Sequence, residues 1–191
     1  MIIGIFGLPG MGKTTVLTKC AQKSLAGKSY LGIKPHSIVY TNFECQGCYK
    51  LDFDALGAYA FTDALILIDE IMLLADTRDF KSFPARLKSW FALHRHRGID
   101  IVWCSQYWDD CDKKIRVLTD HYYLMEKIGN WTVVKPIQRY LGAVDGRMID
   151  SFETGAPITW RFIYRPKYYR YFDSFVVPPL PDYPPLQLWE F

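Results

Sequence analysis

Apolar runs alternate with helical patterns from the first residues of the chain. Residues 2–6 form an apolar run of strand length, and residues from 13 to about 25 have a helical pattern that Gly27 closes. β-Branched residues at 37–42 predict a second strand, and the apolar run at 65–68 predicts a third that is buried on both faces. Strands that alternate with helices predict an α/β fold, with a mostly parallel central sheet flanked by helices.

The same pattern continues through the middle of the chain. Aromatic and aliphatic residues between Phe80 and His94 recur at spacings of three and four, which predicts an amphipathic helix that covers the sheet. Residues 99–104 predict a fourth strand, which brings Ser105 and Gln106 to its carboxyl end. Further strands are expected at 122–126, 131–134 and 158–164.

Length and composition indicate one folded domain. The chain has 191 residues, of which 50% are hydrophobic and 23% charged, so it can bury a sizeable core and is not a disordered chain. We expect the domain to span residues 1–175 and an extended proline-rich tail to follow at 176–191. The net charge of +3 is too small to indicate a histone-like nucleic-acid binder, so any DNA contact must be local.

Targeting and redox signals are sparse. No basic region or cleavage site precedes the glycine loop, and the most apolar stretch, residues 64–75, is too short to span a bilayer, which needs about 20 apolar residues. We therefore expect a cytosolic chain without a transmembrane helix. An odd count of five cysteines favours reduced thiols. The spacing of Cys45 and Cys48 suits a metal, but zinc needs four ligands and no second such pair exists.

A glycine-rich motif follows the first predicted strand. Residues 7–14, Gly-Leu-Pro-Gly-Met-Gly-Lys-Thr, match the P-loop pattern G-x-x-x-x-G-K-[ST] between a strand and a helix. Such a loop points backbone N–H groups at phosphates, its lysine reaches the β- and γ-phosphates, and its hydroxyl ligates Mg²⁺. The residues expected to bind ATP are Gly7, Pro9, Gly10, Met11, Gly12, Lys13, Thr14 and Thr15.

Polar residues follow two of the predicted strands. Asp69 ends the third strand, from which it can hold Mg²⁺ opposite Thr14, and Glu70 is placed to orient or deprotonate the attacking water. An adjacent Asp-Glu pair is also typical of P-loop proteins with an extra strand between the loop strand and the Asp strand. That strand carries a polar sensor, for which Gln106 is the candidate and Ser105 the weaker choice. The alternative is that Glu70 and Gln106 are solvated residues at strand ends.

Basic residues cluster in two places. Arg95 and Arg97 are candidates for an arginine finger that a neighbouring subunit supplies, and the alternative is a charged helix terminus. Basic and aromatic residues are interleaved over 161–172, a pattern that suits a single-stranded nucleic-acid track. An amphipathic edge strand is the slightly favoured alternative for that segment.

These motifs together resemble the zonula occludens toxin (Zot)-like ATPases, the assembly proteins of filamentous phages within the FtsK-HerA class of P-loop NTPases. The resemblance spans about residues 1–175. It lies in the glycine loop, in Tyr40-Thr41-Asn42, in the Asp-Glu strand 67–70, in His94-Arg95-His96-Arg97-Gly98-Ile99-Asp100 with the following Ser105-Gln106, and in Tyr171-Phe172-Asp173-Ser174.

The resemblance implies an oligomeric, ring-forming ATPase that exports or packages phage DNA during virion assembly. It implies viral DNA and coat or other virion proteins as partners, in the host cytoplasm, at the inner face of the membrane or at the assembling virion. It also favours Arg95 over Arg97 as the arginine finger.

Filamentous-phage members of the family carry a transmembrane helix and a periplasmic portion after the ATPase domain, and this sequence shows neither. We therefore expect either the cytosolic portion of a longer protein or a shorter relative that packages DNA without its own anchor, and a membrane-associated partner is a further expectation. The alternative functions are a nucleotide-dependent scaffold that binds coat or membrane partners with little hydrolysis, and a small nucleotide kinase. The kinase is disfavoured because no arginine-rich lid segment is visible.

Overall fold

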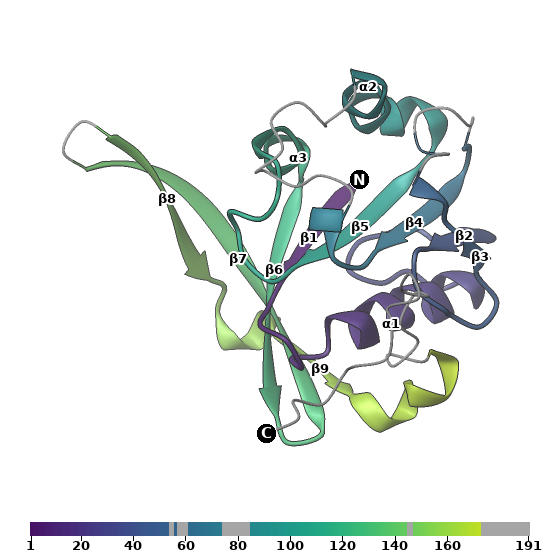
Figure 1. The fold of residues 1–191 in the computed structure, drawn as a ribbon. Helices are drawn as coiled ribbons and strands as arrows, with labels where there is room; N and C mark the ends of the chain where they lie inside the picture. The colour runs from purple at the N-terminus through teal and green to yellow at the C-terminus, as the bar shows by residue number, and fades with distance from the viewer. Residues whose placement is uncertain (54–55, 57–60, 74–84, 145–146, 173–191) are drawn as a thin grey trace, which may run out of the picture.

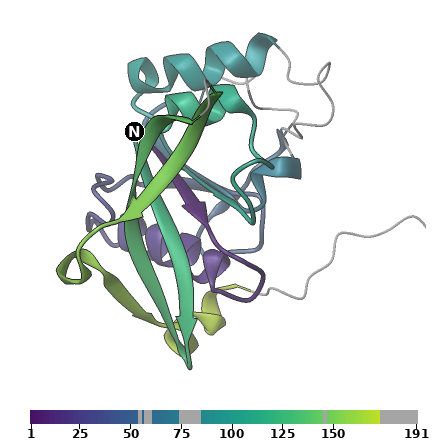
Figure 2. The same ribbon diagram turned by 90° about the vertical axis from the view of Figure 1, so that its left-hand side faces the viewer.

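A computed structural model describes residues 1–53, 56, 61–73, 85–144 and 147–172 (Figures 1 and 2). Within this part of the chain, nine strands form one sheet in the order β3-β2-β4-β5-β1-β6-β7-β8, and β9 pairs with β7. The strands are β1 (Ile2–Phe6), β2 (Ile38–Thr41), β3 (Tyr49–Lys50), β4 (Ala64–Ile68), β5 (Asp100–Ser105), β6 (His121–Ile128), β7 (Trp131–Val144), β8 (Arg147–Thr154) and β9 (Arg161–Tyr164).

The first six strands of the sheet are parallel. β1 lies between β5 and β6 and is parallel to both, and β5 in turn lies between β1 and β4. The strand that carries the glycine loop is therefore separated from the Asp69 strand by one inserted strand. This confirms both the mostly parallel α/β class and the inserted strand that the adjacent acidic pair indicated.

Helices cover both faces of the parallel part. Helix α1 (Lys13–Leu25) packs on one face, and α2 (Ala85–Leu93) and α3 (Lys113–Leu118) pack on the other (Figure 1). Successive side chains of a strand point to opposite faces. Ile3 and Ile5 of β1 accordingly join the core beneath α1, whereas Ile2 and Phe6 join the core beneath α2 and α3. All five residues of β4 are buried, as expected for a central strand.

The amphipathic helix is confirmed over the residues that the structure describes. Leu87, Trp90 and Phe91 of α2 are buried, as is His94 in the 3₁₀ turn that follows, so the predicted face does cover the sheet. Phe80 and Phe83 lie outside the described residues. None of the helices that the structure describes has the length and apolar content needed to cross a membrane.

The last strands form an antiparallel meander that the sequence predicted only in part. β7 pairs with β6 along one edge, and its other edge pairs first with β9 over 131–134 and then with β8 over 137–144. The expected strand at 158–164 is wrong over its first half, because Pro157–Thr159 form a 3₁₀ turn and β9 begins at Arg161. β8 was not predicted. The tail proposed at 176–191 lies outside the described residues.

Beyond residue 137, β7 pairs with β8 alone and the two strands form an arm. Figure 1 shows this hairpin extending away from the helices and the rest of the sheet. Its base is anchored by Trp108, whose ring lies 4.5 Å from that of Phe152 in β8. Trp108 follows Gln106 by two residues, so the arm contacts the loop that carries the candidate sensor.

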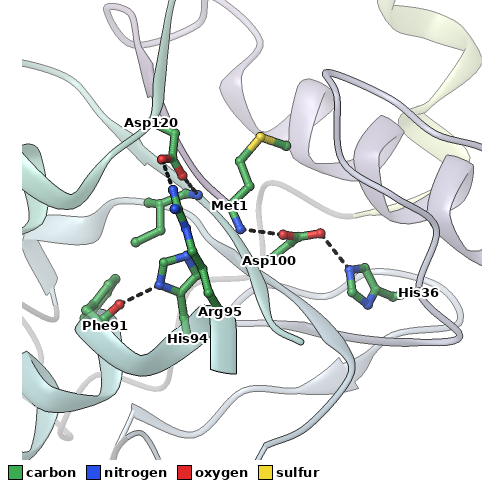
Figure 3. Close-up of polar contacts among 8 residues, drawn as sticks. Met1, His36, Phe91, His94, Arg95, Asp100 and Asp120 are labelled. Carbon is green, nitrogen blue, oxygen red and sulfur yellow. Dashed lines mark hydrogen bonds and ion pairs between the residues drawn. The ribbon is translucent and has the colours of Figure 1, made fainter. Parts of the chain in front are cut away.

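An ion-pair cluster closes the opposite, amino end of the parallel strands (Figure 3). Asp100, at the start of β5, accepts a hydrogen bond from the α-amine of Met1 at 2.6 Å. Its second oxygen lies 2.8 Å from Nε2 of His36, which precedes β2. The Asp100 carboxylate therefore ties the ends of two neighbouring strands to the segment before β2.

We expect Asp100→Asn to destabilise the fold at neutral pH by about 3 kcal/mol, because it leaves the partners of a buried carboxylate uncompensated. Burial alone would raise the pKa of Asp100, but the hydrogen bonds from His36 and the Met1 amine outweigh it, so the pKa lies below its usual value. The stabilisation is thus complete above the unfolded-state pKa of about 3.9 and is lost as pH falls through the lower folded-state pKa. Urea unfolding of the wild type and of Asp100→Asn across pH measures the difference between their free energies of unfolding. A difference that stays constant into strong acid would contradict the prediction.

Candidate functional site

The loop between β1 and α1 lies at the carboxyl end of the parallel strands. Gly10 and Gly12 have φ angles of 77° and 90°, in the left-handed region that favours glycine. A Cβ on Gly12 would lie 2.2 Å from Oγ1 of Thr132, so that position has no room for a side chain. The N–H of Val16 donates to the carbonyl of Gly12 and starts α1 directly behind the loop. The local geometry is that of a phosphate-binding loop before a helix N-terminus.

Lys13 is the cation of this loop. Its side chain is only 6% exposed, and its Nζ donates to the carbonyl of Gly7 at 2.8 Å. The same Nζ lies 3.4 Å from Oε1 of Glu70. A buried ammonium that is held at the mouth of the loop by one carbonyl and one carboxylate can exchange these partners for phosphate oxygens.

Asp69 and Thr14 form an oxygen pair beside Lys13. The Thr14 hydroxyl donates to Oδ2 of Asp69 at 2.6 Å. Asn42, at the end of β2, holds the Asp69 backbone by two hydrogen bonds, donating to its carbonyl at 2.8 Å and accepting from its N–H at 2.7 Å. Burial raises the pKa of Asp69, although the Thr14 hydrogen bond opposes it. A carboxylate and a hydroxyl in contact, with the carboxylate costly to bury, fit the oxygen ligands that Mg²⁺ prefers.

Glu70 has an unusual conformation and one free oxygen. Its φ is 52°, a left-handed value that is uncommon outside glycine and concentrates at functional sites. Oε1 accepts from Nε2 of Gln106 at 3.2 Å and also lies near Lys13. Oε2 is buried and has no hydrogen-bond partner within the described part of the chain. A buried carboxylate oxygen without a partner is available to a water molecule.

The structure therefore brings together five of the residues that the sequence singled out. They lie at the start of α1 and just after β4 and β5, where Thr14 contacts Asp69 and both Lys13 and Gln106 contact Glu70. The weaker sensor candidate, Ser105, instead donates to the carbonyl of Tyr107 at 3.0 Å. Thr15, expected at the phosphates, is 3% exposed in the first turn of α1. The roles assigned to these residues stay predictions.

The two arginines proposed for the finger lie elsewhere. Arg95 pairs with Asp120, which also accepts a hydrogen bond from the N–H of Ile2, at the amino end of β1 (Figure 3). The carbonyl of Arg97 accepts from the N–H of Asp63, just before β4. Because the glycine loop leaves the other end of β1, neither arginine lies at the loop of its own chain. A role toward the loop of a neighbouring subunit stays a prediction.

Two residues that contact the glycine loop were not predicted from the sequence. Thr132 of β7 donates from its hydroxyl to the carbonyl of Met11 at 2.9 Å, and Arg165 donates from Nη1 to the carbonyl of Gly10 at 3.0 Å. The sequence offered Arg165 only as one basic residue among aromatic ones. Its contact with a loop some 155 positions away follows from the meander, which no local spacing reveals.

The strand order, the inserted strand and the glycine loop between β1 and α1 define the P-loop NTPase fold. A family model described as zonular occludens toxin (Zot) matches residues 22–136, and the chain belongs to that family.

Solved structures share this fold. The N-terminal domain of zonular occludens toxin from Neisseria meningitidis matches with a TM-score of 0.57 and 19% identity, covering 90% of this chain and 98% of that chain. The genome packaging NTPase B204 from Sulfolobus turreted icosahedral virus 2, in complex with AMP, matches with a TM-score of 0.52 and 10% identity over 82% of this chain and 96% of that one. A search of curated proteins found no match.

Proposed function

We propose that this protein is an Mg²⁺-dependent ATPase that powers the packaging or export of viral DNA during virion assembly. The proposal rests on two sets of contacts at the mouth of a glycine loop. Thr14 contacts Asp69, and both Lys13 and Gln106 contact Glu70. Membership of the Zot family and the likeness in fold to a genome packaging NTPase support the viral role.

Binding of ATP would use the loop and its neighbouring side chains. Thr14 and Asp69 would hold Mg²⁺, which when bound offsets the negative charge of the phosphates. Lys13 would exchange the Gly7 carbonyl for oxygens of the β- and γ-phosphates. Gly10, Met11, Gly12 and Thr15 would direct backbone N–H groups at the phosphate oxygens, whereas Pro9 has no N–H and would only shape the loop.

Hydrolysis would depend on Glu70. A water held by Oε2 attacks the γ-phosphorus, the bond from that phosphorus to the β–γ bridging oxygen breaks, and the proton of the water passes to Glu70. Gln106 holds the other oxygen of Glu70 at 3.2 Å, so it orients the carboxylate and can sense the γ-phosphate. Departure of phosphate would then change the contacts of Gln106. This residue begins the loop after β5, in which Trp108 contacts the arm.

The same proposal includes a motor role, membership of the FtsK-HerA class and a location in the host cytoplasm. We expect steady-state ATP turnover per chain to rise with protein concentration and with added single-stranded DNA, since a ring completes its sites only on assembly. Flat turnover, with nucleotide-dependent binding of coat protein, would contradict the motor and favour a nucleotide-gated assembly scaffold.

The proposed finger can be tested by mixing two inactive variants. If Arg95 acts on the loop of a neighbouring subunit, Arg95→Ala and Lys13→Ala chains are each inactive, because a finger contributes about 10³- to 10⁵-fold in rate. Mixed oligomers then contain sites with an intact Lys13 facing an intact Arg95. ATPase activity should reappear on mixing. Arg97→Ala, at the other candidate arginine, should keep its activity without mixing, because the family resemblance favours Arg95. No recovery in oligomers shown to be mixed would exclude Arg95 as a finger supplied by a neighbour.

A further inference from the structure

Two side chains from the antiparallel meander hold consecutive carbonyls of the glycine loop. Arg165, in the 3₁₀ turn after β9, donates from Nη1 to the carbonyl of Gly10 at 3.0 Å. Thr132 of β7 donates from its hydroxyl to the carbonyl of Met11 at 2.9 Å. Both donors come from segments other than β1 and α1, the elements that flank the loop. The two carbonyls are thereby fixed in direction.

Fixing a carbonyl also fixes the N–H of the next residue. A trans peptide unit is planar, and its C=O and N–H groups point in opposite directions. When Arg165 holds the Gly10 carbonyl on the outside, the N–H of Met11 points into the loop, where it donates to the carbonyl of Leu8 at 3.3 Å. By the same geometry the N–H of Gly12 points away from Thr132. Such backbone N–H groups are the donors that a phosphate-binding loop offers to its ligand, and the N–H of Met11 would exchange the Leu8 carbonyl for a phosphate oxygen.

The loop packs directly against these two side chains. A Cβ on Gly12 would lie 2.2 Å from the Thr132 hydroxyl oxygen and 3.2 Å from Cδ of Arg165. Thr132 itself is fully buried. The glycine is therefore required not only for its positive φ but also because the supporting side chains leave no space.

Arg165 carries a charge that no carboxylate of the described residues neutralises. A guanidinium stays protonated at any physiological pH. Among the described residues no carboxylate forms an ion pair with Arg165, and its Nε is buried without a hydrogen-bond partner. An uncompensated positive charge directly behind a loop built for phosphates favours binding of a polyanion there.

We propose that Arg165, with Thr132, is a positioning residue of the nucleotide site, which holds the loop with its amides facing the phosphates and adds a positive charge from the same chain. The inference rests on the proposed nucleotide binding. The antiparallel meander then forms part of the site. Strand β7 has two functions, because Thr132 near its start contacts the glycine loop and its last residues form the arm with β8.

The test is a comparison of nucleotide affinity and turnover in four variants. We expect Arg165→Ala to raise the dissociation constant for Mg·AMPPCP and the KM for ATP by about tenfold, the loss of roughly one charge-assisted hydrogen bond, with kcat changed less than about twofold. Arg165→Lys should recover only part of the affinity, because it lacks the planar fork. Thr132→Val should weaken binding by a smaller factor. Arg170→Ala, in the next 3₁₀ turn, is the matched control and should bind as the wild type does.

Each outcome bears on a different claim. Wild-type affinity in folded Arg165→Ala, or an equal loss in Arg170→Ala, would overturn the inference while leaving the proposed function intact. If Arg165→Ala does not fold, the two other variants decide. Wild-type nucleotide affinity in both Thr132→Val and Arg165→Lys would also overturn the inference. A wild-type protein that binds no nucleotide would instead contradict the proposed function on which the inference rests.

Discussion

Lys13→Ala is expected to abolish ATP hydrolysis, lowering turnover by about 1,000-fold or more, and to remove measurable nucleotide binding. The Lys13 ammonium is buried, and it is the cation that the structure holds directly between the loop and Glu70. Its removal leaves the phosphates without their main charge partner and leaves the Glu70 carboxylate beside them, so repulsion adds to the loss of attraction. Titration calorimetry with Mg·AMPPCP and a steady-state phosphate-release assay measure the two effects.

Lys23→Ala is the control for this substitution, since Lys23 lies in the last turn of the same helix, away from the loop. It should bind and hydrolyse ATP as the wild type does. Hydrolysis by Lys13→Ala at even a tenth of the wild-type rate would show that the glycine loop is not where the phosphates bind.

Glu70→Gln is expected to separate binding from cleavage. An amide keeps the shape of the side chain and can still contact Gln106, but it cannot accept the proton of the attacking water at Oε2. We expect kcat to fall by about 10²- to 10⁴-fold while the affinity for nucleotide stays within a few-fold of the wild type, because Lys13, Thr14 and Asp69 remain in place. Single-turnover hydrolysis with limiting ATP isolates the cleavage step from product release.

Glu126→Gln provides the matched control, because Glu126 of β6 is a carboxylate that pairs with Lys135 of β7, and none of the ion pairs of the described residues joins it to the loop. Its turnover should equal that of the wild type. A Glu70→Gln protein that cleaves ATP at the wild-type rate would exclude Glu70 as the base and would reduce it to a partner of Lys13.

The parts of the site that the sequence predicted are those encoded locally. The glycine loop is flanked by its own strand and helix, Asp69 directly follows an apolar run, and Gln106 follows another after Ser105. The carboxyl ends of parallel strands meet at one edge of a sheet, so residues that follow such runs are brought together without any long-range information. Glu70 and Gln106 are adjacent for that reason.

The parts that were missed depend on contacts between distant segments. Thr132 and Arg165 reach the loop only because β7 and β9 pair beside β6, and neither residue stands in a recognisable spacing to residues 7–14. β8 escaped prediction because it pairs with β7 alone, and residues 151–154 are exposed, so they lack a buried face that would impose an alternating pattern. The basic run at 94–97 has a clear pattern, but only the structure shows that Arg95 pairs at the amino end of β1.

We expect a nucleoside triphosphate to bind at residues 7–15, with Asp69 and Glu70 beside its phosphates. The most direct measurement is a crystal structure of the protein with Mg²⁺ and AMPPCP. We expect Lys13 Nζ within hydrogen-bond distance of the β- and γ-phosphates, and the metal on Thr14 with Asp69 beside it. The carbonyls of Gly10 and Met11 should still accept hydrogen bonds from Arg165 and Thr132. A nucleotide bound elsewhere, or a loop whose amides face away from the phosphates, would contradict it.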